Sequence, residues 1–299
     1  MFMDALTMLL GLLALLTGLF SITFFTDVFD HREERAKGTN GGRSPLWISG
    51  VIGLVTNFFD TLGIGSFAPM TALFKATKVV DDAVIPGTLN VANTLPIIFM
   101  AFWYMNGIEV DFLTLTSLIG ASTSGAWLGA GFISKFSKQT IQLTMGLALF
   151  ATASIMTLSV VGVIDGFGTG DSIGLTGGLL IVGVVSHFIL GALMTAGVGL
   201  FAPSMAVVYL LGLSPAVAFP IMMGACAFLL PVASIKFIRE GKYARKQSLT
   251  IAFSGILGVF IAVSIVLNLP MDALAWLVIG VVIFTSLSML QSYFNGKAV

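Results

Sequence analysis

Eleven apolar segments follow one another along this chain, separated by short polar breaks. Most approach the ~20 residues that a helix needs to cross a bilayer. Hydrophobic residues make up 57% of the chain and charged residues only 9%, whereas about a quarter of a typical soluble chain is charged. The pattern predicts an all-α polytopic membrane protein. We expect the segments at residues 5–26, 46–60, 66–76, 83–105, 111–133, 138–163, 172–194, 199–212, 215–236, 248–268 and 271–293.

One phrase of the first half recurs 134 residues later in the second half. Thr61-Leu-Gly-Ile-Gly-Ser-Phe-Ala-Pro69 corresponds to Thr195-Ala-Gly-Val-Gly-Leu-Phe-Ala-Pro203, and the register continues to Pro86 and Pro220. Each phrase interrupts an apolar run, and the segment that follows it is too short to span a bilayer. Interrupted hydrophobic segments at matching places in two halves are the best sequence indication of a transporter binding site.

The distribution of Lys and Arg predicts the topology. Basic residues concentrate in four loops and the C-terminal tail, and the loops between them carry only acidic charges. The positive-inside rule then places the N-terminus outside the cell membrane and the C-terminus in the cytoplasm. We expect residues 1–45 to form an extra N-terminal transmembrane helix and a linker. Residues 46–163 and 164–299 would form two inverted repeats of about five helical segments each, with a broken, re-entrant hairpin in each repeat.

The two glycine-rich breaks predict a site for a small anion. A helix that restarts after Gly65 has Ser66 as a favourable N-cap, and a second helix restarts after Gly199. Two opposed helix N-termini at mid-membrane would hold an anion between them. Glycine also lets the backbone approach a ligand, although small residues could instead serve helix packing. The candidate substrate-binding residues are Thr61, Gly63, Gly65, Ser66, Phe67, Asn90, Asn93, Thr195, Gly197, Gly199, Leu200 and Phe201.

Segment 83–105 contributes Asn90 and Asn93 to this set because they share one helix face with Thr94. That polar face could line the binding cavity, or it could form hydrogen bonds between helices. The spacing is compatible with both interpretations.

Two ionisable residues are predicted to lie inside the bilayer. Asp60 directly precedes the first break, and Met194 takes its place in the second copy. An ionisable side chain at that depth costs at least ~2.5–3.5 kcal/mol on insertion scales, so it is a functional hypothesis by default. We expect Asp60 to couple transport to protons, the alternative being a neutral carboxyl group that caps the broken helix. His187 could join a proton path or bond a backbone carbonyl of its own bundle.

Several other functions are disfavoured. A net charge of zero argues against nucleic acid as a partner, and the single cysteine, Cys226, excludes an internal disulfide and a cysteine-rich metal site. No P-loop motif occurs, so an ion gradient would drive uphill transport. We expect no enzymatic activity, cofactor or metal. The expected partners are a small anionic substrate and membrane lipid, with a homodimer left open.

Two alternative functions compete with transport. A passive anion channel would share the site but would never accumulate its substrate. An intramembrane serine hydrolase could use Ser66 and His187, but a nucleophile has no reason to lie in a duplicated phrase whose other copy has Leu200 at that position.

The two phrases ending in Ala-Pro, each followed by a second proline-bearing helix, resemble the TauE/SafE family of membrane permeases, often called sulfite exporters. The likeness covers most of residues 46–293. It implies transport of a small sulfur-containing or organic anion, such as sulfite or an organosulfonate. The chain departs from the family pattern in its shorter glycine runs, at Gly63-Ile-Gly65-Ser66-Phe67 and Gly197-Val-Gly199-Leu200-Phe201, and in the presence of Asp60.

Overall fold

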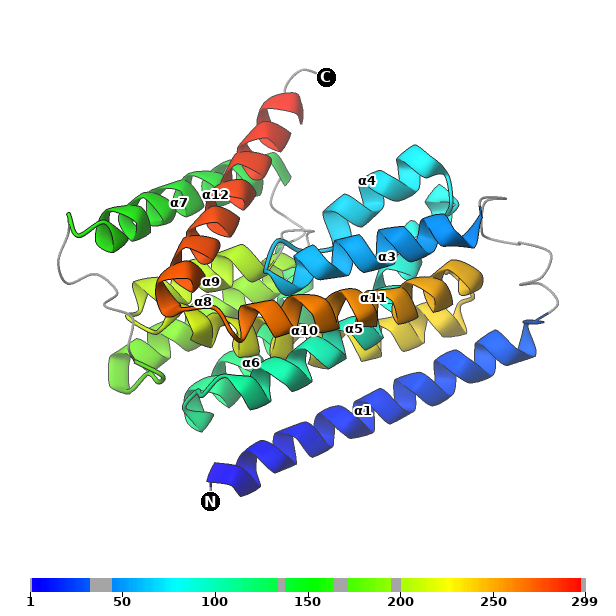
Figure 1. Ribbon diagram of the computed structural model, residues 1–299, viewed down its shortest axis with the longest axis horizontal. Helices are drawn as coiled ribbons and strands as arrows, with labels where there is room; N and C mark the ends of the chain where they lie inside the picture. The colour runs from blue at the N-terminus through cyan, green and yellow to red at the C-terminus, as the bar shows by residue number, and fades with distance from the viewer. Residues whose placement is uncertain (1, 33–44, 134–137, 164–171, 195–199, 297–299) are drawn as a thin grey trace. The chain divides into compact units, whose positions relative to one another are not determined.

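Figure 1 shows the computed structural model, which describes residues 2–32, 45–133, 138–163, 172–194 and 200–296. Within these ranges the chain forms 11 α-helices and two short 3-10 helices, and no strand. The α-helices are α1 (Phe2–Asp30), α3 (Leu46–Thr61), α4 (Phe67–Thr77), α5 (Ile85–Gly107), α6 (Phe112–Ile133), α7 (Lys138–Val160), α8 (Gly177–Met194), α9 (Phe201–Leu210), α10 (Ala218–Arg239), α11 (Arg245–Val266) and α12 (Met271–Gly296). The 3-10 helices are η1 (Asp82–Val84) and η2 (Pro215–Val217).

Every predicted segment corresponds to one of these helices, and the differences lie at the ends. The helix predicted from residue 172 begins at Gly177, and the one predicted from residue 248 begins at Arg245. Helix α1 likewise continues beyond residue 26 to Asp30. Charged residues mark the edge of an apolar run, yet Arg and Lys are good helix formers, whereas glycine-rich stretches count as apolar but are poor ones, so hydropathy alone misplaces such ends.

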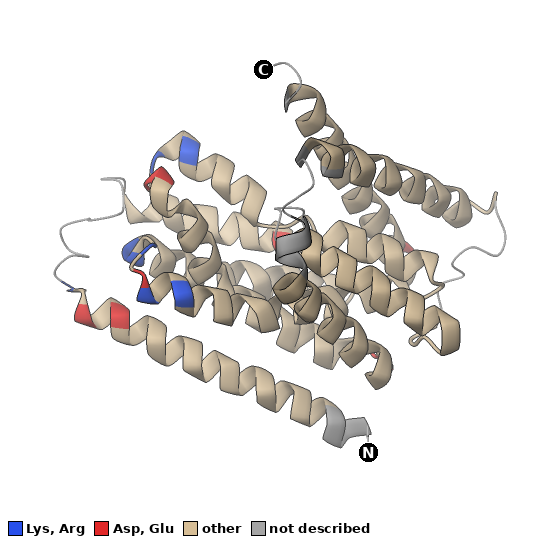
Figure 2. Cartoon of the chain, turned by 180° about the vertical axis from the view of Figure 1, so that it is seen from behind, with Lys and Arg blue, Asp and Glu red and all other residues tan. Residues whose placement is uncertain are grey.

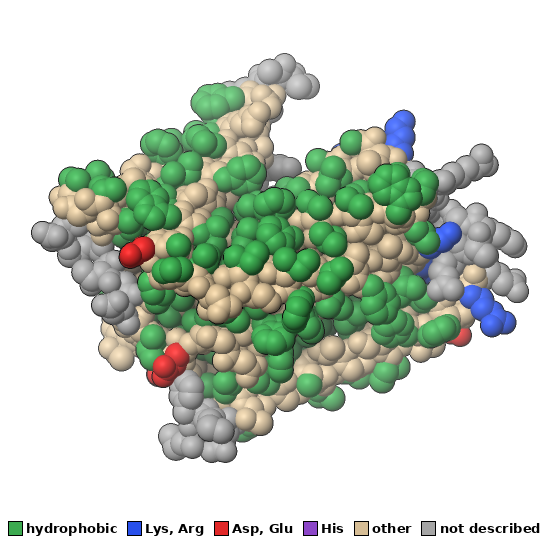
Figure 3. Space-filling model, viewed as in Figure 1, with side chains coloured by type: hydrophobic (Ala, Val, Ile, Leu, Met, Phe, Trp, Pro, Cys, Tyr) green, Lys and Arg blue, Asp and Glu red, His purple; other side chains and the backbone are tan. Residues whose placement is uncertain are grey.

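Seven of the described helices are long and apolar enough to cross a membrane. They are α1, α5, α7, α8, α10, α11 and α12. Large apolar side chains are exposed along them, for example Leu15 of α1 and Phe253 of α11, at 60% and 58%. Figure 3 shows hydrophobic side chains spread over the visible faces of the helices. Exposed apolar surface of this extent is typical of a lipid-facing protein, so these helices indicate an all-helical, multi-pass membrane protein.

The helices form two compact units. The first unit comprises residues 1–103 and 226–265, and the second comprises residues 104–225 and 266–299. Each unit therefore takes helices from both halves of the sequence, and the units do not coincide with the stretches 46–163 and 164–299 that we expect to form the repeats.

In the first unit, glycines let α3 pack directly on α11. A Cβ atom at Gly53 would lie 2.8 Å from the Cα atom of Ile251, and one at Gly258 would collide with the carbonyl oxygen of Leu54. Only residues without a side chain permit this approach, which is the usual way for membrane helices to associate closely.

In the second unit, α6 and α8 pack in the same manner. A Cβ atom at Gly125 would collide with the carbonyl oxygen of Phe188, and one at Gly191 with the carbonyl oxygen of Ser122. The two helices are therefore in backbone contact at two places about one turn apart.

Helix α1 is held to the first unit near its C-terminal end. Tyr243, between α10 and α11, donates its hydroxyl to Asp27 Oδ2, and Arg245 Nε donates to the same oxygen at 2.7 Å. Burial and the hydrogen bond to Asp27 raise the pKa of Tyr243 above its usual range. Around this ion pair, Phe20 and Phe24 of α1 belong to a buried apolar cluster that includes Tyr243.

The described Lys and Arg residues of the first unit gather at one end of it, which we call the basic end (Figure 2). Lys75 lies in the last turn of α4, Lys236 and Arg239 lie in the last turn of α10, and Arg245 begins α11. The start of α5 lies at the same end, because Thr88 Oγ1 accepts a hydrogen bond from the backbone N–H of Ala244 at 2.9 Å.

Candidate functional site

The first break, between α3 and α4, is a tight turn built on two glycines. Helix α3 ends in a Schellman motif, in which the N–H of Gly63 donates to the carbonyl of Asp60 (2.8 Å) and the N–H of Ile64 to that of Phe59 (3.2 Å). Gly63 and Gly65 have φ of 95° and 89°, where side chains are disfavoured. A Cβ atom at Gly65 would meet nothing within 4 Å. Helix packing therefore does not account for Gly65, whereas the shape of the turn does.

Ser66 occupies the N-cap of α4, as predicted, but its side chain does not cap the helix. Its backbone is helical (φ −86°, ψ −28°), and its hydroxyl makes no capping hydrogen bond. The hydroxyl instead donates to Asp60 Oδ2 at 2.9 Å, and both side chains are buried. The prediction of Ser66 as a capping acceptor is wrong because a carboxylate, the stronger acceptor, lies within reach.

Asp60 consequently lies at the N-terminus of α4, where we expected the substrate anion. Its side chain is 1% exposed, and it also interacts with the backbone N–H of Ser66. The protein's own carboxylate thus takes the positive end of the half-helix. A substrate anion can approach this end only if the charge of Asp60 is neutralised or its side chain moves away.

Helix α5 does not present its predicted polar face to a single neighbour. Asn90 is half-buried and donates to the carbonyl of Pro86 in its own helix (2.8 Å). The Asn93 amide points to α4, with Nδ2 3.5 Å from Met70 Sδ. Thr94 contacts α10 through Ser234 Oγ at 2.8 Å. Of the two interpretations left open, hydrogen bonding between helices describes Thr94, while Asn93 stays beside the break.

The remaining candidates of the first break have structural partners. The Thr61 hydroxyl is buried and donates to the carbonyl of Asn57 at 2.7 Å. Phe67 packs against a cluster of buried apolar residues. The sequence reasoning missed Asn57, which is fully buried and lies one turn before Asp60. Its spacing of three residues from Asp60 could have revealed it, since such residues share a helix face.

Asn57 and Asn93, which border the first break, lie level with the middle of the helices around them. Asn93 is eight residues from the start of α5, and Gly255, which faces Asn57, is ten residues from the start of α11. At 1.5 Å per residue these positions are about 12 Å and 15 Å from the basic end. The hydrocarbon core of a bilayer is about 30 Å thick, so Asn57 and Asn93 lie at about half that depth. The turn itself lies deeper, about 16–24 Å from the basic end by the lengths of α4 and α3.

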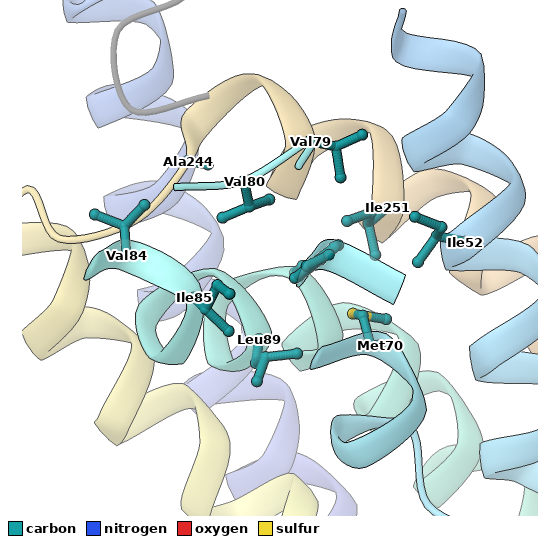
Figure 4. Packing of buried hydrophobic residues seen from close by; sticks show 11 residues of the cluster. Ile52, Met70, Val79, Val80, Val84, Ile85, Leu89, Ala244 and Ile251 are labelled. Atoms are coloured by element: carbon teal, nitrogen blue, oxygen red, sulfur yellow. The ribbon is translucent and has the colours of Figure 1, made fainter. Parts of the chain in front are cut away.

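An apolar cluster separates the break from the basic end. It comprises Ile52, Met70, Phe74, Val79, Val80, Val84, Ile85, Leu89, Ala92, Ala244 and Ile251 (Figure 4). Phe74 and Met70 are fully buried within it.

The second break falls between α8 and α9, and the predicted residues Thr195, Gly197 and Gly199 lie outside the described residues. Helix α9 begins at Phe201, 134 residues after the first residue of α4, and Leu200 occupies the N-cap. Leu200 and Phe201 are both buried. An apolar residue therefore stands where the first copy has the Ser66 hydroxyl.

His187 forms a buried pair with Ser204, a residue that the sequence reasoning missed. His187 Nδ1 lies 3.0 Å from the carbonyl oxygen of Gly183, and Nε2 lies 3.0 Å from Ser204 Oγ. The carbonyl can only accept, so Nδ1 carries the proton and Nε2 accepts from the serine hydroxyl. The backbone-carbonyl bond is the second of the two alternatives predicted for His187, and a role in a proton path stays a prediction.

The described residues contain no group of three or more His, Cys, Asp or Glu side chains that could hold a metal ion. The charged chemistry of the site thus rests on Asp60 and on the polar groups around it. In comparisons with known proteins, no protein-family model, curated protein or solved structure matches this chain.

Proposed function

We propose that this protein is a secondary transporter that carries a small anion across the cell membrane. The observation that carries the proposal is the buried carboxylate of Asp60, bonded to Ser66 at the N-terminus of a helix of 11 residues. An ionisable group in such a position marks an ion or substrate pathway in membrane proteins. The resemblance to the TauE/SafE permeases suggests the substrate class, a sulfur oxyanion such as sulfite or an organosulfonate.

The geometry of α3 and α4 supports a re-entrant hairpin. Helix α3 has 16 residues and α4 has 11, so each is shorter than a membrane span. Both have their outer ends at the basic end, and at 1.5 Å per residue their lengths place the turn about 16–24 Å inside it. Broken helices at this depth are tolerated where they are buried in protein or line a polar cavity, and transporters use them to bind substrate and ions.

Matching contacts within the two units support an inverted repeat. Asn57 faces Gly255 between α3 and α11, and Gly191 faces Ser122 between α8 and α6. Gly191 follows Asn57 by 134 residues, the interval of the repeated phrase. The first helix of each repeat thus packs on the fourth helix of the other. We propose the opposite membrane orientation of the repeats from the charge distribution.

The basic end supports the proposed orientation in the membrane. Helix α1 reaches it with its C-terminal end, where Asp27 pairs with Arg245. If the basic end is cytoplasmic, the N-terminus is external.

Asp60 gives the transporter a means of coupling. While its carboxylate is charged, it occupies the positive end of α4 and repels an anion. A cation that neutralises the carboxylate would allow the substrate to bind, and by linkage the substrate would increase the affinity for that cation. The sequence favours a proton as this cation.

The experiment is anion uptake by purified protein in sealed lipid vesicles. A thermal-shift screen of sulfite, thiosulfate, sulfate, sulfonates and small carboxylates first selects the anion. The wild-type protein should then accumulate that anion when an ion gradient is imposed. Asp60→Asn should still bind the anion but should lose at least 90% of the gradient-driven accumulation.

Glu240→Gln is the matched control, because it also changes a carboxylate to an amide but lies in an exposed pair with Lys242. It should transport like the wild type. Unchanged accumulation in Asp60→Asn would reduce this residue to a helix cap. Flux that never exceeds equilibrium under any gradient would favour a passive channel instead.

The hydrolase alternative would require Ser66 and His187 to act as a pair. Ser66 bonds Asp60 in the first unit, and His187 bonds Ser204 in the second unit. These contacts favour a transporter over a hydrolase built on Ser66 and His187.

A further inference from the structure

Two fully buried amide oxygens of the first unit, Asn57 Oδ1 and Asn93 Oδ1, have no hydrogen-bond partner among the described residues. The amide nitrogens donate to the carbonyls of Gly53 (2.9 Å) and Leu89 (2.8 Å). These bonds fix the orientation of both amide groups, because exchanging the nitrogen and oxygen of either amide would place its oxygen against a carbonyl oxygen. Buried acceptors without a donor are costly and rare, so these two oxygens indicate a bound group.

The two oxygens belong to side chains that are linked through the first break. Asp60 lies one turn after Asn57 on α3, and its carboxylate accepts the hydroxyl of Ser66. Met70 lies one turn after Ser66 on α4, since its N–H donates to the Ser66 carbonyl. The Met70 sulfur lies 3.5 Å from the amide nitrogen of Asn93 on α5.

The remaining contacts close this series of neighbouring side chains into a ring. Pro96 lies one turn after Asn93 on α5, and both Pro96 and Asn57 lie against Gly255 of α11. A Cβ atom at Gly255 would lie 2.7 Å from Asn57 Nδ2 and 2.9 Å from Pro96 Cγ. We call this set the acceptor ring. It comprises Asn57, Asp60, Ser66, Met70, Asn93, Pro96 and Gly255.

The acceptor ring offers oxygen ligands and one negative charge. Besides the two amide oxygens and the Asp60 carboxylate, the carbonyl of Ala92 lacks its usual intrahelical donor, because Pro96 has no N–H. The C-terminal end of α3, with its partial negative charge, also points to the break. None of the seven ring residues is basic. Such an environment disfavours a free anion and suits a cation with hard oxygen ligands.

We propose that the acceptor ring binds a sodium ion, which serves as the coupling ion of the proposed transporter. A single carboxylate matches a monovalent cation in charge. Broken membrane helices coordinate Na⁺ in this way, through half-helix C-terminal ends and freed carbonyls. The bound ion neutralises Asp60 and thereby frees the N-terminus of α4 for the substrate anion. The inference rests on the proposed function for its coupling role, and it replaces the proton that the sequence favours.

The test is direct binding of radioactive Na⁺ to the purified full-length protein, with choline as the inert cation. The wild type should bind Na⁺ saturably without any substrate present. Asn57→Leu and Asn93→Leu should each weaken this binding at least tenfold, and Asp60→Asn should abolish it. Thr56→Val is the matched control, since the buried Thr56 hydroxyl bonds the Ile52 carbonyl of its own helix. It should bind within twofold of the wild type.

Thermal unfolding gives a second measurement on the same variants. Na⁺ should raise the midpoint of the wild type and of Thr56→Val by several degrees, and it should leave both asparagine variants unchanged. If a leucine variant does not fold in the choline buffer, the alanine variant at that position replaces it, and the same loss of Na⁺ binding is expected. No saturable Na⁺ binding by the wild type, or wild-type affinity in both asparagine variants, would overturn the site and leave only buried water.

Uptake with imposed gradients separates this inference from the proposed function. Anion accumulation driven by a Na⁺ gradient supports both. Accumulation driven by a proton gradient alone, without Na⁺ binding, overturns the sodium site and keeps the transporter. Na⁺ binding without movement of any anion keeps the site and overturns the transporter.

Discussion

Helices α4 and α9 begin at equivalent places in the two units, yet different side chains surround them. Asp60 and Ser66 precede and cap α4, whereas Met194 and Leu200 occupy the equivalent positions before α9. The comparison shows that the two copies share the place where a short helix begins. The ionisable chemistry belongs to one copy.

The second unit has its polar pair at other positions of the same frame. His187 and Ser204 are hydrogen-bonded there, and the equivalent residues of the first unit are Gly53 and Met70. Gly53 is needed for the close approach of α11. The first unit therefore combines a tight helix contact with a charged site, and the second unit buries a neutral histidine–serine pair.

The largest effect on the free energy of unfolding is expected at the close glycine contacts between helices, which both units have. Gly258→Ala in the first unit and Gly125→Ala in the second each drive a methyl group into a backbone carbonyl. Each should lower the free energy of unfolding by about 3 kcal/mol or more. Gly120→Ala, at a position with nothing within 4 Å of a Cβ atom, should cause no loss, because alanine favours helix. Unfolding in detergent measures all three, and tolerance of alanine at only one of the two positions would break the equivalence of the units.

A smaller effect on the free energy of unfolding is expected at the first break. Ser66→Ala removes a hydrogen bond to the Asp60 carboxylate and should cost about 1.5–3 kcal/mol of stability if that carboxylate is charged. The measurement is the unfolding free energy of Ser66→Ala with and without the Asp60→Asn background. A cost that persists in this background would show that the hydroxyl acts independently of the charge.

The smallest effect is expected at the neutral pair of the second unit. Ser204→Ala removes a hydrogen bond to neutral His187 and should cost about 1 kcal/mol. A double-mutant cycle with His187→Ala should give a coupling energy of similar size. A cost for Ser204→Ala as large as that for Ser66→Ala would argue that His187 is charged, and it would remove the contrast between the two units.

The positions of the breaks could be predicted from the sequence, but their side-chain partners could not. The phrase fixes the start of α4 and α9 at an interval of 134 residues. The 3-10 helices that follow are 133 residues apart, because α9 is one residue shorter than α4. The ungapped match of Pro86 and Pro220 concealed this difference, since an identity at one position says nothing about where a helix ends.

The candidate residues that could be chosen from the sequence are those whose signal is local. Asp60 stands out because an acidic residue within an apolar run is costly in a membrane. Asn57 and Ser204 were missed, because an asparagine or serine in a membrane helix is common enough to pass as helix packing. Their importance depends on Gly255 and His187, which are distant in the sequence.

By itself, the sequence determined the helices, their membrane class and the two breaks. The reason is that lipid offers backbone groups no hydrogen bonds, so apolar runs must be helical and each interruption must be compensated within the protein. Only the tertiary structure decided that α3 packs on α11, that Asp60 takes the N-terminus of α4 and that two amide oxygens remain without donors. These features depend on which helix faces meet, and helices of similar apolar composition carry little information about their neighbours.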